Sequence, residues 1–382
     1  MCRTYAIFSA QYPPHMGGIE SFTQNMAHAL AAKGASVIVV TNDTNLVGVG
    51  IEDDMDIKVL RFSCFPLVDG RFPVARINNK NRNLWNWLNA QHLDGVLINA
   101  RFYLHSIAGI KFARRKGLRP IVLDHGSAHL SFSNPMLDPF VCIYEHLITA
   151  WGKRYRPAYY GVSQKSTEWL LHFGIKAEGV IPNAIDAEKY REMTSGRNFR
   201  HELKVRENQF IVTYIGRFIP EKGIKSIIDA SKSQRLIDLG VNFVLAGDGP
   251  MSSAVELAQG ESFHWVGRLS ASDVSALLQQ SNLLCLPTRS EGFSTILLEA
   301  AACGCPAVVT DVGGARELIP GSEYGTIIKS MSAESVEQAI NQVVSNRSLL
   351  KSQSKAVRML VESKHSWRDS AEMLRSAFTF VS

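Results

Sequence analysis

The sequence predicts an α/β protein built from two doubly wound, Rossmann-like domains. Short β-branched runs alternate with longer segments of helical periodicity, which is the pattern of parallel sheets covered by helices. The chain has 382 residues, and at roughly 100–200 residues per domain this length indicates about two domains. In such sheets ligands bind beyond the carboxyl ends of the strands, so we expect functional residues in the loops that follow the strands.

The expected strands are short, apolar and rich in β-branched residues, as buried parallel strands are. They cover Val37–Thr41, Gly95–Asn99, Ile121–Leu123, Phe210–Ile215, Asn242–Ala246, Leu283–Pro287 and Ala307–Thr310. Two helices have clear end signals. Ser21–Lys33 has one apolar face and ends at Gly34, while Ser270–Ser281 begins with a capping-box pattern.

A domain boundary is expected between Pro182 and Gln209, because a polar, charged run separates the Pro182-Asn183 pair from the next strand. We place the first domain at residues 1–184 and the second at residues 185–365. The closing helical segment, about 366–382, is assigned to the first domain.

The charge of the chain is uneven. It has 41 Lys and Arg against 35 Asp and Glu, a formal net charge of +6. Residues 1–184 hold 19 basic and 13 acidic residues (+6), whereas residues 185–382 hold 22 of each (zero). The whole surplus lies in the first half, which indicates an acidic partner for that half alone.

Several classes of protein are excluded. No apolar run approaches the ~20 residues of a membrane helix, and the N-terminus lacks the pattern of a secretory signal, so we expect a cytoplasmic protein. The cysteines are scattered, and we expect them to be reduced and structural; Cys303-Gly-Cys305 lacks the spacing of a zinc site.

Two glutamates dominate the segment after the strand at 283–287. Glu291 lies in a loop and Glu299 two turns into the following helix, so both can face one cleft. Free amides of Phe293, Ser294 and Thr295 at the helix start suit a phosphate, and a carboxylate can hold ribose hydroxyls. The alternative is that Glu299 caps local structure and Glu291 is a solvated acid.

A glycine-bounded basic loop follows the strand at 210–215. It begins at Gly216 and presents Arg217 and Lys222, two cations suited to a diphosphate. It is not a Walker loop, and a solvated basic turn is the alternative. After the next strand, Gly247 allows close backbone approach to a ligand, or serves only the turn.

Two further candidates lie in the first half. Gly17 and Gly18 precede the first helix and would let amide donors approach an anion, but they do not form the Gly-x-Gly-x-x-Gly dinucleotide motif. His125 follows the strand at 121–123, where ligands gather. A structural histidine is the alternative, and there are competing candidates at His105, His129 and His146.

Together these segments resemble the retaining family-4 glycosyltransferases of the GT-B fold, in which two Rossmann-like domains face a central cleft. The resemblance covers about residues 5–375, and the segment 367–380 resembles the family's last helix, which crosses back to the first domain. The motifs occur in family order: Pro-x-x-Gly17-Gly18, His125, Ser163, Ile181-Pro-Asn183, Gly216-Arg217, Glu221-Lys222-Gly223, Gly247-Asp-Gly-Pro250, Glu291-x7-Glu299 and Gly313-Gly314.

The resemblance implies a UDP- or GDP-linked sugar donor, held mainly by the second domain, and an acceptor site on the first. Arg217 and Lys222 would neutralise the diphosphate, Glu299 would bind the ribose, and Glu291 and His125 would be the catalytic residues at the donor sugar. The remaining matches are donor-diphosphate contacts at Gly17, Gly18, Phe293, Ser294 and Thr295, and further cleft positions at Gly216, Gly247 and Asn183.

The implied reaction is hexosyl transfer with retention, without a metal ion or other cofactor. Ser294 stands where the family often has a second glycine, and Ala184 where it has one after Pro-Asn, so fine positioning can differ. Alternatives within the fold are a nucleotide-sugar 2-epimerase, a glycogen-synthase-like enzyme and a non-catalytic sugar-nucleotide-binding protein.

We expect a glycan or lipid-linked saccharide acceptor, in bacterial cell-surface polysaccharide, lipopolysaccharide or glycolipid synthesis. Basic residues of the first half are interleaved with aromatic residues, a combination that suits peripheral contact with an anionic membrane at its inner face. A solvated basic surface is the alternative. We expect no nucleic-acid partner, because no nucleic-acid-binding module is present.

Overall fold

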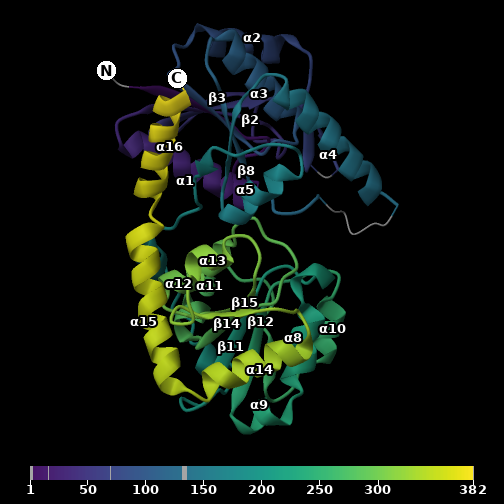
Figure 1. Ribbon diagram of the computed structural model, residues 1–382, viewed down its shortest axis with the longest axis vertical. Helices are drawn as coiled ribbons and strands as arrows, with labels where there is room; N and C mark the ends of the chain where they lie inside the picture. The colour runs from purple at the N-terminus through teal and green to yellow at the C-terminus, as the bar shows by residue number, and fades with distance from the viewer. Residues whose placement is uncertain (1–2, 16, 69, 131–135, 382) are drawn as a thin grey trace. The chain divides into compact units, whose positions relative to one another are not determined.

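The computed structural model describes residues 3–381 except 16, 69 and 131–135 (Figure 1). The chain divides into two compact units. Unit 1 consists of residues 1–183 with 367–382, and unit 2 of residues 184–366. Each unit is an α/β domain with its own sheet, as the sequence predicts.

Unit 1 contains an eight-stranded sheet of order β10-β9-β8-β7-β1-β2-β4-β3, which is parallel except for β3. A two-stranded hairpin, β5 with β6, stands beside it. The strands are β1 (Thr4–Phe8), β2 (Ser36–Asn42), β3 (Gly50–Asp54), β4 (Ile57–Phe62), β5 (Cys64–Leu67), β6 (Phe72–Ala75), β7 (Gly95–Asn99), β8 (Ile121–Asp124), β9 (Ala158–Gly161) and β10 (Gly179–Val180).

The helices of unit 1 are α1 (Gly18–Ala32), α2 (Asn79–Ala90), α3 (Leu104–Arg115), α4 (Asp138–Lys153), α5 (Gln164–Leu171) and α16 (Trp367–Val381). The C-terminal helix α16 packs beside α1. Its Phe378 ring stacks on Tyr5 of β1 with the ring centroids 4.7 Å apart, so the last segment of the chain completes the core of unit 1. The expected final helix is therefore present.

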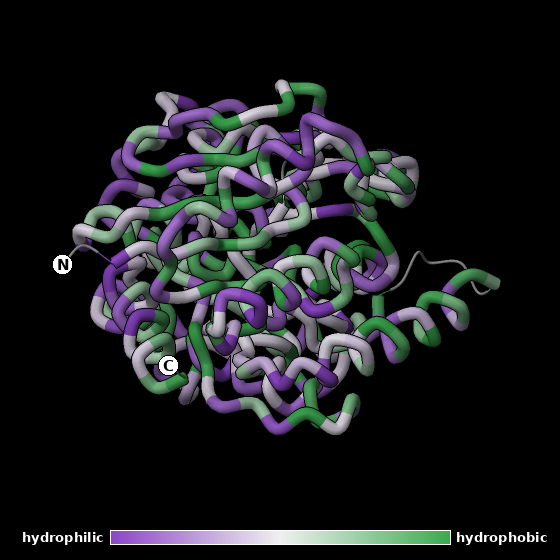
Figure 2. Tube along the Cα trace, turned by 90° about the horizontal axis from the view of Figure 1, so that it is seen from above, coloured by the Kyte–Doolittle hydropathy of each residue, from purple (hydrophilic) through white to green (hydrophobic). Residues whose placement is uncertain are grey.

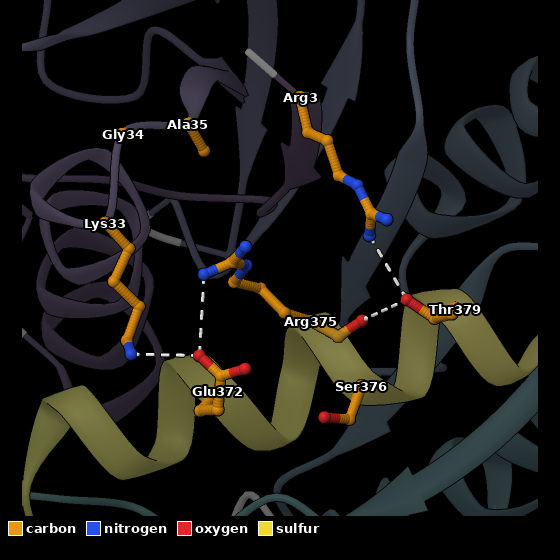
Figure 3. A pocket seen from close by; sticks show the side chains of 8 residues that line it. All are labelled: Arg3, Lys33, Gly34, Ala35, Glu372, Arg375, Ser376 and Thr379. Atoms are coloured by element: carbon orange, nitrogen blue, oxygen red, sulfur yellow. Dashed lines mark hydrogen bonds and ion pairs between the residues drawn. The ribbon is translucent and has the colours of Figure 1, made fainter. Parts of the chain in front are cut away.

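A pocket of about 340 Å³ opens where α16 meets the start of the chain (Figure 3). In it Lys33 Nζ donates to Glu372 at 2.9 Å, and Arg3 donates to the Thr379 hydroxyl at 3.1 Å. Arg3 precedes β1, and Ala35 precedes β2. The pocket thus lies at the amino ends of the strands, opposite the edge at which α/β sheets bind ligands. Its carboxylate, Glu372, pairs with Lys33 and Arg375.

Unit 2 contains a six-stranded, fully parallel sheet of order β13-β12-β11-β14-β15-β16. The central strands are almost entirely buried and mostly apolar, as strands covered on both faces must be, with Thr213 and Asn242 as buried polar residues. The strands are β11 (Phe210–Ile215), β12 (Val241–Ala246), β13 (Phe263–Trp265), β14 (Leu283–Leu286), β15 (Ala307–Thr310) and β16 (Thr326–Ile328).

The helices of unit 2 are α6 (Ala187–Glu192), α7 (Phe199–Glu202), α8 (Ile224–Ser231), α9 (Gln234–Asp238), α10 (Ser252–Leu257), α11 (Ala271–Gln280), α12 (Thr295–Ala302), α13 (Ala315–Leu318), α14 (Ala333–Val344) and α15 (Arg347–Lys364), together with the 3₁₀ turn η1 (Pro220–Lys222). Ser270 is the N-cap of α11 as predicted, because its hydroxyl accepts from the Asp273 amide at 3.2 Å, and the hydroxyl also contacts the Asp273 carboxylate at 2.8 Å. In the described part of the chain, no helix is both long and apolar enough to cross a membrane.

The expected strands are all present, and β7, β11 and β15 have the predicted bounds. Strands β8, β12 and β14 differ by one residue at one end, and β2 is longer by one residue at each end. The first helix begins at Gly18 rather than at Ser21, because Gly17 is still in extended backbone and the Ser21 amide already donates to its carbonyl. The prediction of two Rossmann-like domains is confirmed.

Candidate functional site

The motifs of the second half gather at one edge of the sheet of unit 2. Strands β12, β11 and β14 are neighbours and run parallel, so their carboxyl ends lie side by side. The loop that begins at Gly216 follows β11, Gly247 follows β12, and the loop that carries Glu291 follows β14. Residues far apart in the sequence therefore meet where an α/β sheet binds ligands.

The turn η1 places Lys222 against the loop that follows β14. Gly223 ends the turn with φ at 71°, and a Cβ there would lie 2.2 Å from the Pro287 carbonyl oxygen. The Arg289 amide donates to the Glu221 carbonyl at 2.8 Å across the same junction. Only glycine fits this close approach, which holds the two loops together.

Lys222 and Glu291 form an ion pair. Their side chains are 23% and 22% exposed, so the pair lies at the surface of the loop junction and remains open to a ligand. The family resemblance assigns the cation to the diphosphate and the carboxylate to the sugar of a donor molecule. In the structure they are each other's partner.

Glu299 accepts a hydrogen bond from the Tyr190 hydroxyl at 2.9 Å. Tyr190 lies in α6 and Glu299 in α12, and these two helices pack together. Burial raises the pKa of Glu299, while the Tyr190 hydroxyl opposes this change. Tyr190 thus orients the carboxylate. Sequence reasoning missed this residue, because a lone tyrosine on a short helix has no distinctive pattern.

The start of α12 has no side-chain cap. Ser294 is the N-cap residue, and its hydroxyl makes no capping hydrogen bond. The first amides of a helix have no intrahelical partner, so this end of α12 presents donors that suit an anion. The preceding loop packs closely against Gly313 and Gly314. A Cβ at Gly313 would lie 2.5 Å from the Glu291 carbonyl oxygen, and a Cβ at Gly314 would lie 2.5 Å from the Phe293 ring.

Arg217 is exposed and, within the residues that the structure describes, has no carboxylate partner. The nearby glycines, Gly216 and Gly247, allow two backbone segments to come close together. A Cβ at Gly247 would lie 1.9 Å from the carbonyl oxygen of Gly216, so Gly247 lets the two loops touch. The close approach at Gly247 in the structure is to the Gly216 backbone, and the predicted approach to a ligand stays a prediction.

In unit 1, His125 follows β8 and ends a buried chain of polar side chains. Its Nε2 lies 3.2 Å from Asn99 Oδ1, and Asn99 Nδ2 donates to the Thr23 hydroxyl at 2.7 Å. Because the Asn99 amide nitrogen is used on Thr23, its oxygen accepts from His125 Nε2–H. Burial lowers the pKa of His125 to about 3, which keeps the imidazole neutral with Nδ1 as an acceptor.

Gly17 and Gly18 begin α1, again without a side-chain cap. The Glu20 carboxylate lies against Gly17, where a Cβ would be 2.2 Å from its oxygen, whereas a Cβ at Gly18 would meet nothing within 4 Å. Burial raises the pKa of Glu20. The open side of this helix start is therefore at Gly18.

The other candidates have different surroundings. His105 is buried with Nε2 2.9 Å from the Val40 carbonyl oxygen, which makes it a structural histidine. Asn183 is buried and is the last residue of its unit before the chain enters unit 2. His129 and His146 belong to a separate cluster in unit 1. Asn99, which forms a hydrogen bond with His125, was not among the residues predicted from the sequence. A polar residue at the end of a buried strand could have indicated it.

Solved structures with the same architecture define the class. Sucrose-phosphate synthase from Thermosynechococcus elongatus matches with a TM-score of 0.76 at 18% identity, over 99% of this chain and 98% of that one. HepE of Anabaena in complex with UDP matches with a TM-score of 0.71 at 17% identity, over 99% and 100% of the two chains. Both likenesses show the fold, and the chain has the GT-B fold of glycosyltransferases.

Two family profiles then give the family. The profile described as Glycosyltransferase Family 4 matches residues 16–189, and the profile described as Glycosyl transferases group 1 matches residues 196–359. The chain belongs to the family-4, group 1 glycosyltransferases, as its motifs predict.

Relatives among curated proteins are distant. The GPI3 subunit of the phosphatidylinositol N-acetylglucosaminyltransferase of Saccharomyces cerevisiae is 24% identical over 97% of this chain and 81% of its own length. An uncharacterized glycosyltransferase of Methanocaldococcus jannaschii is 28% identical over 45% of this chain and about half (49%) of its own length. Identities of this size do not define substrates.

Proposed function

We propose that this protein transfers a hexose with retention, from a UDP- or GDP-linked donor to a hydroxyl of a lipid-linked saccharide. The observation that carries the proposal is the group at one edge of the sheet of unit 2. There a Lys222–Glu291 pair, the Glu299 carboxylate and the uncapped start of α12 follow neighbouring strands. Cations, free amides and sugar-binding carboxylates together suit a nucleotide diphosphate sugar.

We propose unit 2, with residues 185–365 as its predicted extent, as the donor-binding domain. Lys222, Arg217 and the amides of residues 293–295 would bind the diphosphate, and Glu299 the ribose. UDP is favoured as the nucleotide, since the HepE structures with this fold contain UDP or UDP-glucose.

The proposed reaction places the negative charge where the protein has cations. The bond from the anomeric carbon to the diphosphate oxygen breaks, a bond to the acceptor oxygen forms on the same face, and the acceptor proton passes to the leaving phosphate. Lys222, Arg217 and helix amides stabilise the departing diphosphate, which is the work a metal ion does elsewhere. We therefore propose a metal-independent reaction.

Two residues are proposed to act at the donor sugar. When Lys222 turns to the diphosphate, the Glu291 carboxylate exchanges its contact with Lys222 for hydrogen bonds from sugar hydroxyls. From the family correspondence, we assign His125 a contact with the donor sugar. Its neutral state supports this assignment, because a neutral imidazole can accept a hydroxyl proton at Nδ1 without adding positive charge.

For the acceptor we propose a lipid-linked saccharide, bound by unit 1 beside a membrane surface. Helix α4 supports this, since Phe140, Ile143 and Leu147 are 71%, 57% and 67% exposed, and their spacing puts them on one face. Hydrophobic residues recur along α4 in Figure 2. Basic residues follow this face, at Lys153, Arg154 and Arg156. Apolar and basic residues together favour an anionic membrane.

A coupled assay tests the reaction. Purified protein is incubated with UDP- or GDP-sugars chosen from a thermal-shift screen, with and without membrane-extracted acceptor lipids. Nucleotide diphosphate released only with acceptor supports transfer. Equal release without acceptor would indicate an epimerase or hydrolase, and thermal stabilisation without release would indicate a binding protein.

Flotation with liposomes tests the membrane contact. The F140S/L147S double variant should lose binding to vesicles that contain anionic lipid, while Leu257→Ser, an 88%-exposed leucine of unit 2, should bind as the unchanged protein does. Negligible binding of the unchanged protein to anionic and neutral vesicles alike would refute this part of the proposal.

A further inference from the structure

Three histidines from separate segments meet at the surface of unit 1. His129 lies in the loop after β8, His146 in the middle of α4, and His172 directly after α5 (labelled elements in Figure 1). One ring nitrogen from each lies within 4.8 Å of the others. Spacings of 17 and 26 residues form no metal motif in the sequence, so the cluster exists only through the fold.

A buried carboxylate orients the central imidazole. Glu145 Oε2 lies 2.9 Å from His129 Nδ1 and also accepts from the Leu130 amide at 3.0 Å. The Glu145 side chain is 1% exposed and its other oxygen accepts from Arg101 at 3.1 Å, so its position is fixed. The proton of His129 is therefore on Nδ1, and Nε2 keeps a lone pair for a ligand. Histidines that bind metals are typically held in this way.

A thiol and an aromatic ring lie beside the cluster. Cys142 Sγ lies 3.4 Å from His129 Nε2, one turn before His146 on α4. The Trp169 ring stacks on His172 with the centroids 4.8 Å apart and the planes at 5°. Trp169 thus limits the orientation of His172, while the exposure of His146 and His172 leaves them room to adjust.

We propose that His129, His146 and His172 bind one zinc ion, which links the loop after β8 to α4 and α5. Imidazole and thiol donors suit Zn²⁺, whereas Ca²⁺ and Mg²⁺ require oxygen ligands, and the Glu145 carboxylate beside the cluster is already bound to His129 and Arg101. Zinc–nitrogen bonds of about 2.1 Å put tetrahedral ligand nitrogens about 3.4 Å apart. Small rotations of His146 and His172 would bring the ring nitrogens, now within 4.8 Å of one another, to this spacing.

The consequence of zinc binding would be local order. Glu145 holds both His129 and Leu130, and His129 lies only four residues after His125. An ion on His129 would therefore fix the segment that leads away from His125. The ion takes no part in the chemistry proposed above, and its presence does not depend on that chemistry.

Metal analysis of tag-free protein tests the proposal. After chelation, reloading with Zn²⁺ and dialysis, we expect one zinc per chain. A zinc concentration about 100 times the dissociation constant should raise the unfolding temperature of unit 1 by roughly 5–10 °C. Cobalt in place of zinc should give the visible absorption of a tetrahedral site.

Single variants decide which residues bind the metal. H146A and H172A replace exposed side chains, so both proteins should fold, and each should bind zinc at least about 10-fold more weakly. His201→Ala, an exposed histidine of unit 2, is the matched control and should bind zinc as the unchanged protein does. Zinc lost on dialysis from the unchanged protein, or kept equally by both cluster variants, would overturn the proposal.

Discussion

The Lys222 ammonium is ion-paired with the Glu291 carboxylate, 69 residues further along the chain. Lys222 is proposed to bind the donor diphosphate and Glu291 the donor sugar, and in the structure the two side chains contact each other. A donor diphosphate would compete with Glu291 for Lys222. We therefore expect the two residues to exchange their mutual contact for contacts with the donor.

Removing either member of this pair should impair turnover without unfolding the protein. We expect Lys222→Ala and Glu291→Ala each to lower kcat/KM by about 10²–10³, the usual effect of losing one preorganised charge contact. The unfolding temperature should change little, because a partly exposed ion pair contributes only about 0–1 kcal/mol. Lys225→Ala, which removes a more exposed ion pair in the same unit, is the control. Near-normal turnover in both variants would refute the assigned roles.

The Tyr190–Glu299 hydrogen bond predicts a variant that affects binding more than chemistry. Tyr190→Phe removes the donor that orients the Glu299 carboxylate, at 2.9 Å. We expect KM for the donor to rise about 10-fold, in line with the roughly 1.5–3 kcal/mol of a hydrogen bond to a charged group, while kcat changes less. Steady-state kinetics at varied donor concentration measure both values.

A matched tyrosine controls for the loss of a hydroxyl. Tyr324 is also in unit 2 and is partly buried, and Tyr324→Phe should leave both kinetic constants unchanged. If Tyr190→Phe instead lowers kcat with KM unchanged, Glu299 acts in the chemical step and not in binding the ribose.

The sequence predicted seven of the sixteen strands that the described residues form. Runs such as Phe210–Ile215 and Ala307–Thr310 are buried on both faces, and their apolar pattern gives their bounds directly. It did not predict β3, which lies at the sheet edge and alternates between half-buried and exposed residues, because such a strand carries little apolar signal. It also missed the buried strands β1, β4 and β9; in β4 the apolar residues are interrupted by Lys58 and Arg61.

The contacts within the sites were beyond prediction for a different reason. That Lys222 reaches Glu291 depends on the packing of Gly223 against the Pro287 carbonyl, which is a tertiary contact. The three-histidine cluster likewise depends on where α4 and α5 pack. The sequence gives residue types and their loops, while partners follow only from three-dimensional packing.

His105 predicts that unit 1 loses stability in mild acid. Burial lowers the pKa of His105 to about 4, below the ~6.5 of the unfolded chain. Between pH 6.5 and 4 the unfolded state therefore binds one more proton at this site than the folded state. The free energy of unfolding should fall as the pH falls, by up to about 1.4 kcal/mol per pH unit from His105.

Urea unfolding between pH 7 and pH 5 measures this slope. His105→Gln keeps a donor near the position of Nε2, which contacts the Val40 carbonyl, but cannot be protonated. In this variant the free energy of unfolding should depend less steeply on pH, and the difference in slope should correspond to at most one proton. Parallel curves for the two proteins would show that His105 titrates normally in the fold.

Two glycines of unit 2 predict a contrast in stability. Both have positive φ, 139° at Gly247 and 71° at Gly267, but a Cβ at Gly247 would lie 1.9 Å from the Gly216 carbonyl oxygen, whereas one at Gly267 would meet nothing within 4 Å. Gly267→Ala should cost only the backbone strain, about 1–2 kcal/mol. Gly247→Ala should cost more than about 3 kcal/mol, because backbone must also move. Urea unfolding measures both, and equal losses would show that the loops after β11 and β12 separate readily, so that they could not hold Arg217 in place.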